Sequence, residues 1–343
     1  MKTYLVTGGC GFIGSNFIRY MFEKYDNIQI INLDYLTYAG NLENLLDYQN
    51  NKNYKFVKGD ICNQIIVSKI FKEYDIDYVV NFAAESHVDR SISEPQIFTK
   101  TNILGTSVLL YNAKENWKTD KGFKLNKKFL QVSTDEVYGS LGKEGYFTEN
   151  TPLNPRNPYS ACKAGADLIV KSYFDTFNFP MNITRCSNNF GPYQYPEKLI
   201  ALVFNKCKNL KNIPIFGDGL QIRDWIFVED HCKAIDLVLH KAQIGKVYNI
   251  GGHNEKTNLF IVKKIIDYVK KNVNKDCSDE LITFVNDRLG HDRRYAMNSS
   301  KINKELGWKP ETSFEDGLKN TLDWYKNNDE WIKKIEKKPI VKV

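Results

Sequence analysis

The chain has 343 residues, of which 42% are hydrophobic and 13% aromatic, and its formal net charge is +7 at pH 7. The length leaves room for about two domains, and the composition excludes a disordered or fibrous protein. No apolar run approaches the roughly 20 residues of a membrane span, and the first seven residues lack a signal-peptide layout, so we expect a cytoplasmic protein without a membrane partner.

The cysteine, histidine and charge patterns exclude several other classes. The seven cysteines never form Cys-x-x-Cys, and the five histidines never form His-x-x-x-His. These patterns argue against a disulfide framework and a zinc site, so we expect no bound metal. Part of the positive charge lies in residues 333–338, which we interpret as a solvated helix end, and we therefore expect no nucleic-acid partner.

The first predicted strand, 2–7, leads into a glycine-rich loop and a helix that begins near Ile13. Gly8, Gly11 and Gly14 form Gly-x-x-Gly-x-x-Gly, which suits a tight turn, close approach of a pyrophosphate and close helix packing. The N-terminus of the helix offers free N–H groups to phosphates. The triplet alone is weak evidence, because a tight structural turn would also explain it.

The second predicted strand, 28–33, strengthens the dinucleotide interpretation. It ends at Asp34, twenty residues after Gly14, where a carboxylate would bind the adenine ribose hydroxyls. The same charge would repel a 2′-phosphate, which favours NAD over NADP. The alternative is a turn aspartate that only follows a strand.

Two more strands, 54–58 and 77–82, are expected before a helix over 95–117. Asp60 follows the first of them and would either hydrogen-bond the adenine or cap the helix that starts at Asn63. The second leads into the small residues Ala83 and Ala84, which let the backbone pass close to a cofactor. The alternation of strands and helices predicts an α/β fold with a Rossmann-like, doubly wound parallel sheet.

We expect the catalytic residues to follow the next predicted strand, 129–132. Asp135 and Glu136 follow its carboxyl end, where ligand sites collect in open α/β sheets. A helix over 158–177 begins with Tyr159, and Lys163 lies four residues on, on the same helix face. The ammonium can therefore lie beneath the phenol and lower its pKa, so that the tyrosine deprotonates an alcohol during hydride transfer. Tyr159 by itself is more often a packing residue.

The composition changes after the predicted strand 181–185, where 186–198 is rich in Asn, Tyr and Pro. We expect residues 1–187, with return segments at about 221–252, to form the NAD-binding domain. Residues 188–343 would mainly form a smaller mixed α/β lobe that binds a sugar nucleotide.

Within this second part we expect four strands and one long helix. In chain order they are the strands 214–216, 225–228 and 247–250, the helix 259–273 and the strand 282–285. The strands 225–228 and 247–250 would return to the first domain. The loop 287–295 has the charge to hold a diphosphate, although it could also be a salt-bridged surface loop. Ser299 and Ser313 are predicted to cap two closing helices.

Together these residues resemble the extended short-chain dehydrogenase/reductases and, within them, the nucleotide-sugar 4,6-dehydratases. The matching motifs span almost the whole chain and include 8–14, 34–41, 83–89, 133–139 and Tyr159-x-x-x-Lys163. The segment 133–139 discriminates best, because epimerases and decarboxylases of the superfamily lack an Asp-Glu pair directly after that Thr or Ser. Cys10 stands where Ala is common in the family, and Leu289 stands where Pro is usual.

The resemblance implies a set of site residues and an NAD cofactor that stays tightly bound and is recycled. The catalytic set is Thr134, Asp135, Glu136, Tyr159 and Lys163. The cofactor-binding set is Gly8, Gly11, Phe12, Ile13, Gly14, Asp34, Thr37, Asp60, Ile61, Ala83, Ala84, Ser86, Thr101, Tyr159, Lys163 and Asn189. The substrate-binding set is Ser86, Thr134, Asn188, Lys198, Leu199, Pro214, Phe216, Arg223, Asn258, Arg288 and His291.

The implied reaction converts NDP-glucose to NDP-4-keto-6-deoxyglucose and water, as a lyase that feeds rhamnose-type 6-deoxysugar synthesis. Tyr159 takes the 4-hydroxyl proton while C4 gives a hydride to NAD⁺. Glu136 removes the C5 proton, Asp135 protonates the departing 6-hydroxyl, and the hydride returns to C6. The resemblance also implies a homodimer that pairs the helices 95–117 and 158–177.

Three alternatives stay open. Thr257-Asn258 slightly favours dTDP over UDP as the nucleotide, although the two differ by too little for any residue to decide. An NDP-sugar 4-epimerase or decarboxylase of the same fold is disfavoured by Asp135-Glu136. A non-catalytic NAD-binding regulator is disfavoured because Tyr159 and Lys163 are both present.

Overall fold

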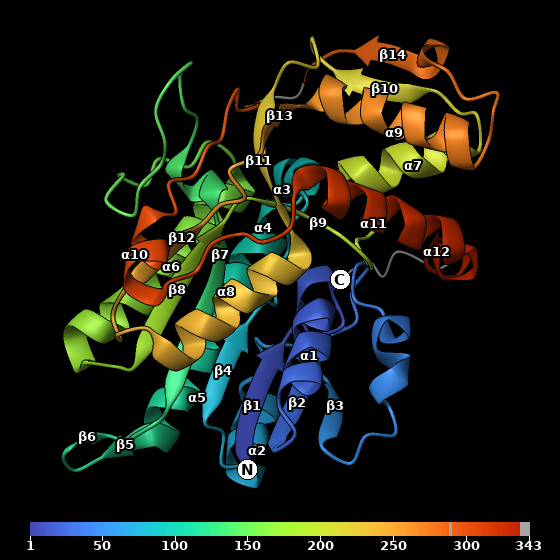
Figure 1. Cartoon of the computed structure of the whole chain (residues 1–343). Coiled ribbons are helices and arrows are strands. Elements are labelled where there is room, and N and C mark those ends of the chain that lie inside the picture. The colour runs from blue at the N-terminus through green and yellow to red at the C-terminus, as the bar shows by residue number, and fades with distance from the viewer. Residues whose placement is uncertain (288–289, 337–343) are drawn as a thin grey trace.

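A computed structural model describes residues 1–287 and 290–336 (Figure 1). Within these residues, seven parallel strands form the main sheet, in the order β12-β8-β7-β4-β1-β2-β3. Their bounds are β1 (Lys2–Thr7), β2 (Ile28–Asp34), β3 (Tyr54–Lys58), β4 (Tyr78–Asn81), β7 (Lys128–Thr134), β8 (Met181–Cys186) and β12 (Val247–Ile250). The chain order reverses between β1 and β4, and ligands bind at such switch points. The predicted doubly wound sheet is confirmed.

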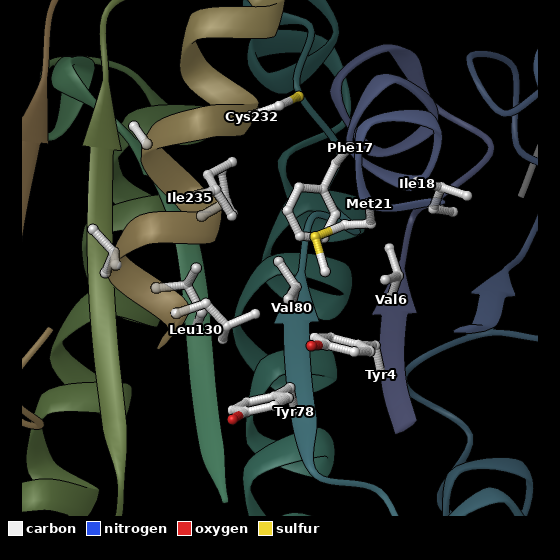
Figure 2. Packing of buried hydrophobic residues seen from close by; sticks show 14 of the residues in the cluster. Tyr4, Val6, Phe17, Ile18, Met21, Tyr78, Val80, Leu130, Cys232 and Ile235 are labelled. Atoms are coloured by element: carbon white, nitrogen blue, oxygen red, sulfur yellow. The ribbon is translucent and has the colours of Figure 1, made fainter. Parts of the chain in front are cut away.

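Helices cover both faces of the main sheet because its central strands are apolar on both sides. One layer consists of α1 (Phe12–Lys24), α8 (Val228–Lys241) and the short α10 (Ser300–Leu306). The other consists of α2 (Gln64–Glu73), α5 (Thr106–Trp117) and α6 (Pro158–Phe177). Figure 2 shows Phe17 and Met21 of α1 near Val6 and Val80 of the sheet. Neighbouring residues such as Leu5 and Val79 face the opposite layer, since side chains alternate along a strand.

Two helices of the main-sheet layers start where local side chains satisfy their first N–H groups. Asn63 accepts hydrogen bonds from the amides of Ile65 and Ile66, so Asn63 and not Asp60 caps α2. Asn157 forms a reciprocal capping box with Ser160, and Pro158 occupies the first turn of α6. The prediction that Asp60 could cap this helix is therefore wrong.

The predicted helix 95–117 is interrupted. It consists of α4 (Pro95–Phe98), a π-helical segment η2 (Thr99–Gly105) and α5. Within η2 the side chain of Asn102 accepts a hydrogen bond from the Glu85 amide and donates one to the Glu85 carbonyl, at 2.9 and 3.0 Å. This tie to the loop after β4 explains the wide turn, and π-helical turns are frequent at functional sites.

The smaller lobe lies beyond the carboxyl ends of the main-sheet strands (Figure 1). Its strands are β9 (Asn188–Phe190), β11 (Ile222–Phe227) and β13 (Glu255–Thr257) in one sheet, and β10 (Ile213–Phe216) and β14 (Ile282–Val285) in another. Its helices are α7 (Leu199–Lys208), α9 (Asn258–Asn272), α11 (Phe314–Asn327) and α12 (Asp329–Glu336). These elements share one apolar core that includes Phe204, Ile261 and Leu322.

The remaining elements are short: η1 (Leu42–Tyr48), α3 (Val88–Ser93), β5 (Lys118–Thr119), β6 (Gly122–Phe123), η3 (Asp135–Tyr138) and η4 (Asp279–Leu281). Within residues 1–287 and 290–336, no helix is long and apolar enough to cross a bilayer.

The two predicted return segments pair with different sheets. β12 joins the main sheet, but β11 pairs with β9 and β13 instead. The carboxylate of Asp224 accepts hydrogen bonds from the amides of Gly252 and Asn254, which holds β11 against the loop after β12. Residues 225–228 were expected to return to the first domain; they do not pair with the main sheet, but Ile226 and Val228 pack in the same apolar core as Phe17 of α1.

The caps of the closing helices also differ. Ser313 caps α11 by accepting a hydrogen bond from the Asp316 amide, as predicted. Ser299 precedes α10, but its hydroxyl accepts the Gly251 amide at 2.7 Å and forms no cap hydrogen bond. In the described part of the chain three helices close the fold, α10 to α12, rather than two.

Candidate active site

A cavity of about 530 Å³ lies at the carboxyl ends of the central strands and reaches into the smaller lobe. Most of the predicted site residues lie in its wall. They are Gly8, Gly11, Phe12, Ile13, Gly14, Asp34, Thr37, Asp60, Ile61, Ala83, Ala84, Ser86, Thr101, Thr134, Asp135, Glu136, Tyr159, Lys163, Asn188, Asn189 and Lys198. The structure therefore brings the predicted cofactor and catalytic residues into one space.

The glycine loop after β1 fits closely against its neighbours. A Cβ atom on Gly8 would lie 2.7 Å from the backbone nitrogen of Ala83, and one on Gly14 would lie 2.4 Å from the carbonyl oxygen of Gly8. Gly11 stands at the N-cap of α1 and has no side chain to occupy the first N–H groups of the helix. The loop is therefore a tight cradle that brings the first turn of α1, Phe12 to Gly14, to the cavity wall, and a helix N-terminus suits a pyrophosphate.

Asp34 ends β2 and is buried at the edge of this cradle. Its two carboxylate oxygens accept hydrogen bonds from the amides of Cys10 and Leu36, both at 2.8 Å. These bonds fix the carboxylate and leave acceptor capacity toward the cavity, since a carboxylate has about four lone-pair positions. Asp60 also lines the wall, where its Oδ1 accepts the Cys62 amide. The donor and acceptor set fits an adenine nucleotide.

The predicted catalytic carboxyls begin a short helical turn, η3, directly after β7. The hydroxyl of Thr134 accepts the Glu136 amide at 3.3 Å and donates to Asp135 Oδ1 at 3.2 Å. Asp135 is 2% exposed, and its pKa is raised well above its usual range by burial first and then by Glu136 and Asp224. Burial also raises the pKa of Glu136, and this rise is opposed by the nearby positive charges of Arg223 and Lys198.

The two carboxyls thus differ in electrostatic surroundings. Asp135 lies next to two other carboxyl groups, so its proton is favoured. Glu136 has Arg223 and Lys198 as its main opposing charges, so its anion is supported. Neighbouring carboxyls with separated pKa values are suited to act as one acid and one base.

Tyr159 and Lys163 lie one turn apart on α6, and both are buried. The Lys163 ammonium donates to the Val132 carbonyl at 2.7 Å, and burial lowers the pKa of this lysine. The pKa of Tyr159 is raised, chiefly by burial and then by the Glu136 carboxylate, although a hydrogen bond from Thr134 opposes the rise. The expected lowering of the Tyr159 pKa by Lys163 is therefore wrong, because burial and a neighbouring anion prevail.

Several predicted substrate residues lie in the smaller lobe outside the cavity wall. These are Leu199, Pro214, Phe216, Arg223, Asn258 and His291. Gln221 links some of them: its side chain donates to the Phe216 carbonyl and to Asp287, and its carbonyl accepts the Asn258 amide. His291 Nδ1 lies 2.5 Å from Asp287 Oδ1. Arg288 and Leu289, also part of this prediction, lie outside the described residues.

Arg223 connects this group electrostatically to the cavity. Its guanidinium donates to the carbonyls of Ile222 and Asp292 and stacks on the ring of Tyr295 at 4.2 Å. This fixed position lets its charge lower the pKa of both Asp135 and Glu136.

The wall also contains residues that were not assigned a role from the sequence, among them Gln96, Lys100, Gln194, Tyr195 and Glu197. The unusual composition of 186–198 pointed to the last three. Lys100 lies in the π-helical segment η2, which no periodicity predicts.

Comparisons with known proteins agree with this site. The family model described as GDP-mannose 4,6 dehydratase matches residues 5–321. A dTDP-glucose 4,6-dehydratase of Xanthomonas campestris is 47% identical over 98% of this chain and 96% of its own. A crystal structure of dTDP-glucose 4,6-dehydratase from Bacillus anthracis in complex with NAD is 49% identical, with a TM-score of 0.88 over 98% of this chain and 100% of that one. The DesIV dTDP-glucose 4,6-dehydratase from Streptomyces venezuelae, also crystallised with NAD, is 41% identical, with a TM-score of 0.90 over 97% and 99%.

The doubly wound sheet, its glycine cradle and the buried Tyr159–Lys163 pair are those of an extended short-chain dehydrogenase/reductase. Asp135 and Glu136 line the same cavity as Tyr159 and Lys163. The chain belongs to the nucleotide-sugar 4,6-dehydratase family, as its motifs predicted.

Proposed function

We propose that the protein is an NAD-dependent dTDP-glucose 4,6-dehydratase, which converts dTDP-glucose to dTDP-4-keto-6-deoxyglucose and water. One observation supports this most strongly: Asp135 and Glu136 are adjacent in the cavity wall, and burial raises the pKa of both, with Glu136 and Asp224 adding to the rise at Asp135 while Arg223 and Lys198 oppose it at Glu136. A 4-epimerase has no use for such a pair, because it moves no proton at C5 and releases no water.

The residues of the cavity fit NAD. The cradle of Gly8, Gly11 and Gly14 would hold the pyrophosphate, and Asp34 the adenine ribose. The NAD complexes of the relatives from Bacillus anthracis and Streptomyces venezuelae support this assignment. When bound, NAD⁺ accepts the hydride from C4 and later returns it to C6. Its positively charged ring also favours a phenolate in the same cavity.

The protein's own residues would move the protons. Tyr159 would take the proton of the sugar 4-hydroxyl, and Thr134 would hydrogen-bond the same oxygen. The resulting ketone acidifies the C5–H bond, from which Glu136 would take the proton. Asp135 would protonate the 6-hydroxyl as it leaves as water. Lys163, fixed by the Val132 carbonyl, would contribute positive charge beside the phenolate.

The smaller lobe would hold the nucleotide diphosphate. Lys198 faces the cavity, and its ammonium is anchored by the Ser86 carbonyl at 3.3 Å. Asn188 lines the same wall, and Arg223 would add charge from behind it. We assign Leu199, Pro214, Phe216, Asn258, Arg288 and His291 to nucleotide binding, and dTDP is preferred over UDP because the relatives at 41 to 49% identity are named for it.

Three further assignments accompany this proposal. We divide the chain into 1–187 with return segments near 221–252, and 188–343, in accord with one apolar core for the smaller lobe. A homodimer is supported by the exposed apolar side chains of Leu104, Tyr111, Leu168 and Phe177 on η2, α5 and α6. Free thiols at all seven cysteines suit a reducing compartment, so we assign the protein to the cytoplasm.

The test is turnover of dTDP-glucose and UDP-glucose, side by side, in deuterated water, followed by mass spectrometry and NMR. We expect loss of water, one solvent deuterium at C5, and faster turnover of dTDP-glucose. Formation of the galactose epimer without deuterium would refute the roles of Asp135 and Glu136. Faster turnover of UDP-glucose would change only the assignment of the nucleotide, from dTDP to UDP.

A further inference from the structure

Tyr38, on the segment between β2 and η1, forms a direct contact between the two parts of the fold. Its hydroxyl donates a hydrogen bond to Glu197 Oε1 in the smaller lobe, at 2.9 Å. Thr37 and Ala39, which flank Tyr38, line one side of the cavity, and Glu197 lines another. The bond therefore joins two walls of the same cavity.

Further contacts hold both partners of this bond in place. The guanidinium of Arg90 stacks on the Tyr38 ring at 4.4 Å, and Tyr195 packs edge-on against it at 5.4 Å. The other oxygen of Glu197 lies 3.7 Å from Nε2 of His87 in the loop after β4. We call Tyr38, His87, Arg90 and Glu197 the clasp, because they join three chain segments around the cavity.

The Tyr38 hydroxyl is held in its protonated, hydrogen-bond-donating form. Tyr38 is buried, and burial together with the Glu197 carboxylate raises the pKa of its phenol, so the hydroxyl keeps the proton that it donates. A hydrogen bond to a charged acceptor away from water is stronger than one between neutral groups.

We propose that the clasp retains the cofactor: the Tyr38–Glu197 bond must break before the cavity walls separate and NAD leaves. This inference rests on the proposed function. The hydride taken from C4 must return to C6 of the same sugar, so a cofactor that left between the two steps would abandon the reaction halfway. Retention by the clasp would keep one NAD on the protein through many turnovers.

The central variant is Tyr38→Phe, which removes the hydroxyl and keeps the ring between Arg90 and Tyr195. We expect NAD to dissociate about 10-fold faster, as for loss of one hydrogen bond to a charged group. The rate is measured on purified protein loaded with NAD, using excess alcohol dehydrogenase and ethanol to convert released NAD to NADH, followed at 340 nm. This readout does not depend on dehydratase activity.

A matched control is Tyr20→Phe. Tyr20 also donates its hydroxyl to a carboxylate, Asp236, at 3.0 Å, but this pair lies between α1 and α8, outside the cavity wall. The control should release NAD at the wild-type rate. Glu197 also faces the cavity, so its own effect is separated by a double-mutant cycle with Glu197→Ala and the double variant. NAD should dissociate from the double variant no faster than from the faster of the two single variants.

The outcomes are distinct. If NAD dissociates from Tyr38→Phe at the wild-type rate, the clasp is overturned. It is also overturned if Tyr20→Phe releases NAD as fast as Tyr38→Phe does, because that would indicate general loosening. If the rate increase of the double variant equals the product of the two single increases, Tyr38 and Glu197 act separately, which would also overturn the clasp. If Tyr38→Phe fails to fold by circular dichroism, Glu197→Ala against Tyr20→Phe decides. A wild-type protein that binds no NAD would refute the proposed function itself.

Discussion

Replacement of Asp135 by Asn would test whether this carboxyl is the acid that releases water from the sugar. Asn has nearly the same shape and keeps an oxygen that can accept the Thr134 hydroxyl, now 3.2 Å from Asp135 Oδ1. Asp135 Oδ2 has no hydrogen-bond partner within residues 1–287 and 290–336, so no protein bond is broken there. The change therefore removes a proton donor and little else.

The expected loss follows from the protonation state of Asp135. Burial, Glu136 and Asp224 raise its pKa well above the usual range, which favours the protonated acid that the substitution removes. Positioned acids contribute about 10² to 10⁴ in rate, which corresponds to about 3 to 5 kcal/mol in the activation barrier. We expect kcat to fall by about that factor. Oxidation at C4 and proton exchange at C5 should continue, because Tyr159 and Glu136 remain.

The assay follows dTDP-glucose in deuterated water. Asp135→Asn should form product slowly while recovered substrate gains deuterium at C5, whereas Glu136→Gln should give no such deuterium. Asp175→Asn, on the exposed face of α6 beside Lys171, is the matched control and should behave as wild type. A kcat for Asp135→Asn within 10-fold of wild type, or no deuterium at C5, would refute the assigned role.

Three other predictions concern stability, cofactor binding and assembly. Burial raises the pKa of Asp224 to about 7, so the folded protein binds a proton that the unfolded chain releases near pH 4. As the pH rises between these values, the protein's free energy of unfolding should fall by up to about 1.4 kcal/mol per pH unit. Urea titrations of Asp224→Asn should show a shallower fall with pH than the wild type, and an equal fall would contradict this prediction. His231 is held neutral by a pKa lowered to about 3, and its Nδ1 lies 2.8 Å from Oδ1 of Asn189 in the cavity wall. His231→Leu should weaken NAD binding about 10-fold in calorimetric titration, while His231→Asn, which keeps a donor, should weaken it less; equal losses would show that the hydrogen bond is irrelevant. Leu168 is exposed on α6, so we expect Leu168→Glu to convert the proposed homodimer to a monomer in analytical ultracentrifugation, and a dimer that persists would place the interface elsewhere.

The parts of the fold that local chemistry specifies could be predicted from the sequence. The apolar strands, the glycine loop and the capped helix at Pro158 were identified because each has a residue pattern that follows from backbone geometry. Asp135 and Glu136 were placed correctly in the cavity because they follow directly on a predicted strand, whose carboxyl end must lie at the ligand-binding edge.

Features that depend on contacts between distant residues could not be predicted. Ser299 was expected to cap a helix, but its hydroxyl bonds to the Gly251 amide, 48 residues away. β11 pairs with β9 and β13, and its Asp224 accepts hydrogen bonds from the amides of Gly252 and Asn254. In each case a polar side chain had two possible partners, and only the tertiary structure selects one.

The pKa of Tyr159 shows the same limit and leads to a last prediction. Helical spacing correctly placed Lys163 one turn away, but it could not reveal that burial and Glu136 raise the phenol pKa. The base must therefore form when positive charge enters the cavity, so we expect phenolate absorbance near 295 nm to increase when NAD⁺ is added to protein freed of cofactor, and not when NADH is added. Tyr159→Phe should lose this increase. An equal increase with NADH, or one that survives in Tyr159→Phe, would show that the cofactor charge does not produce the base at Tyr159.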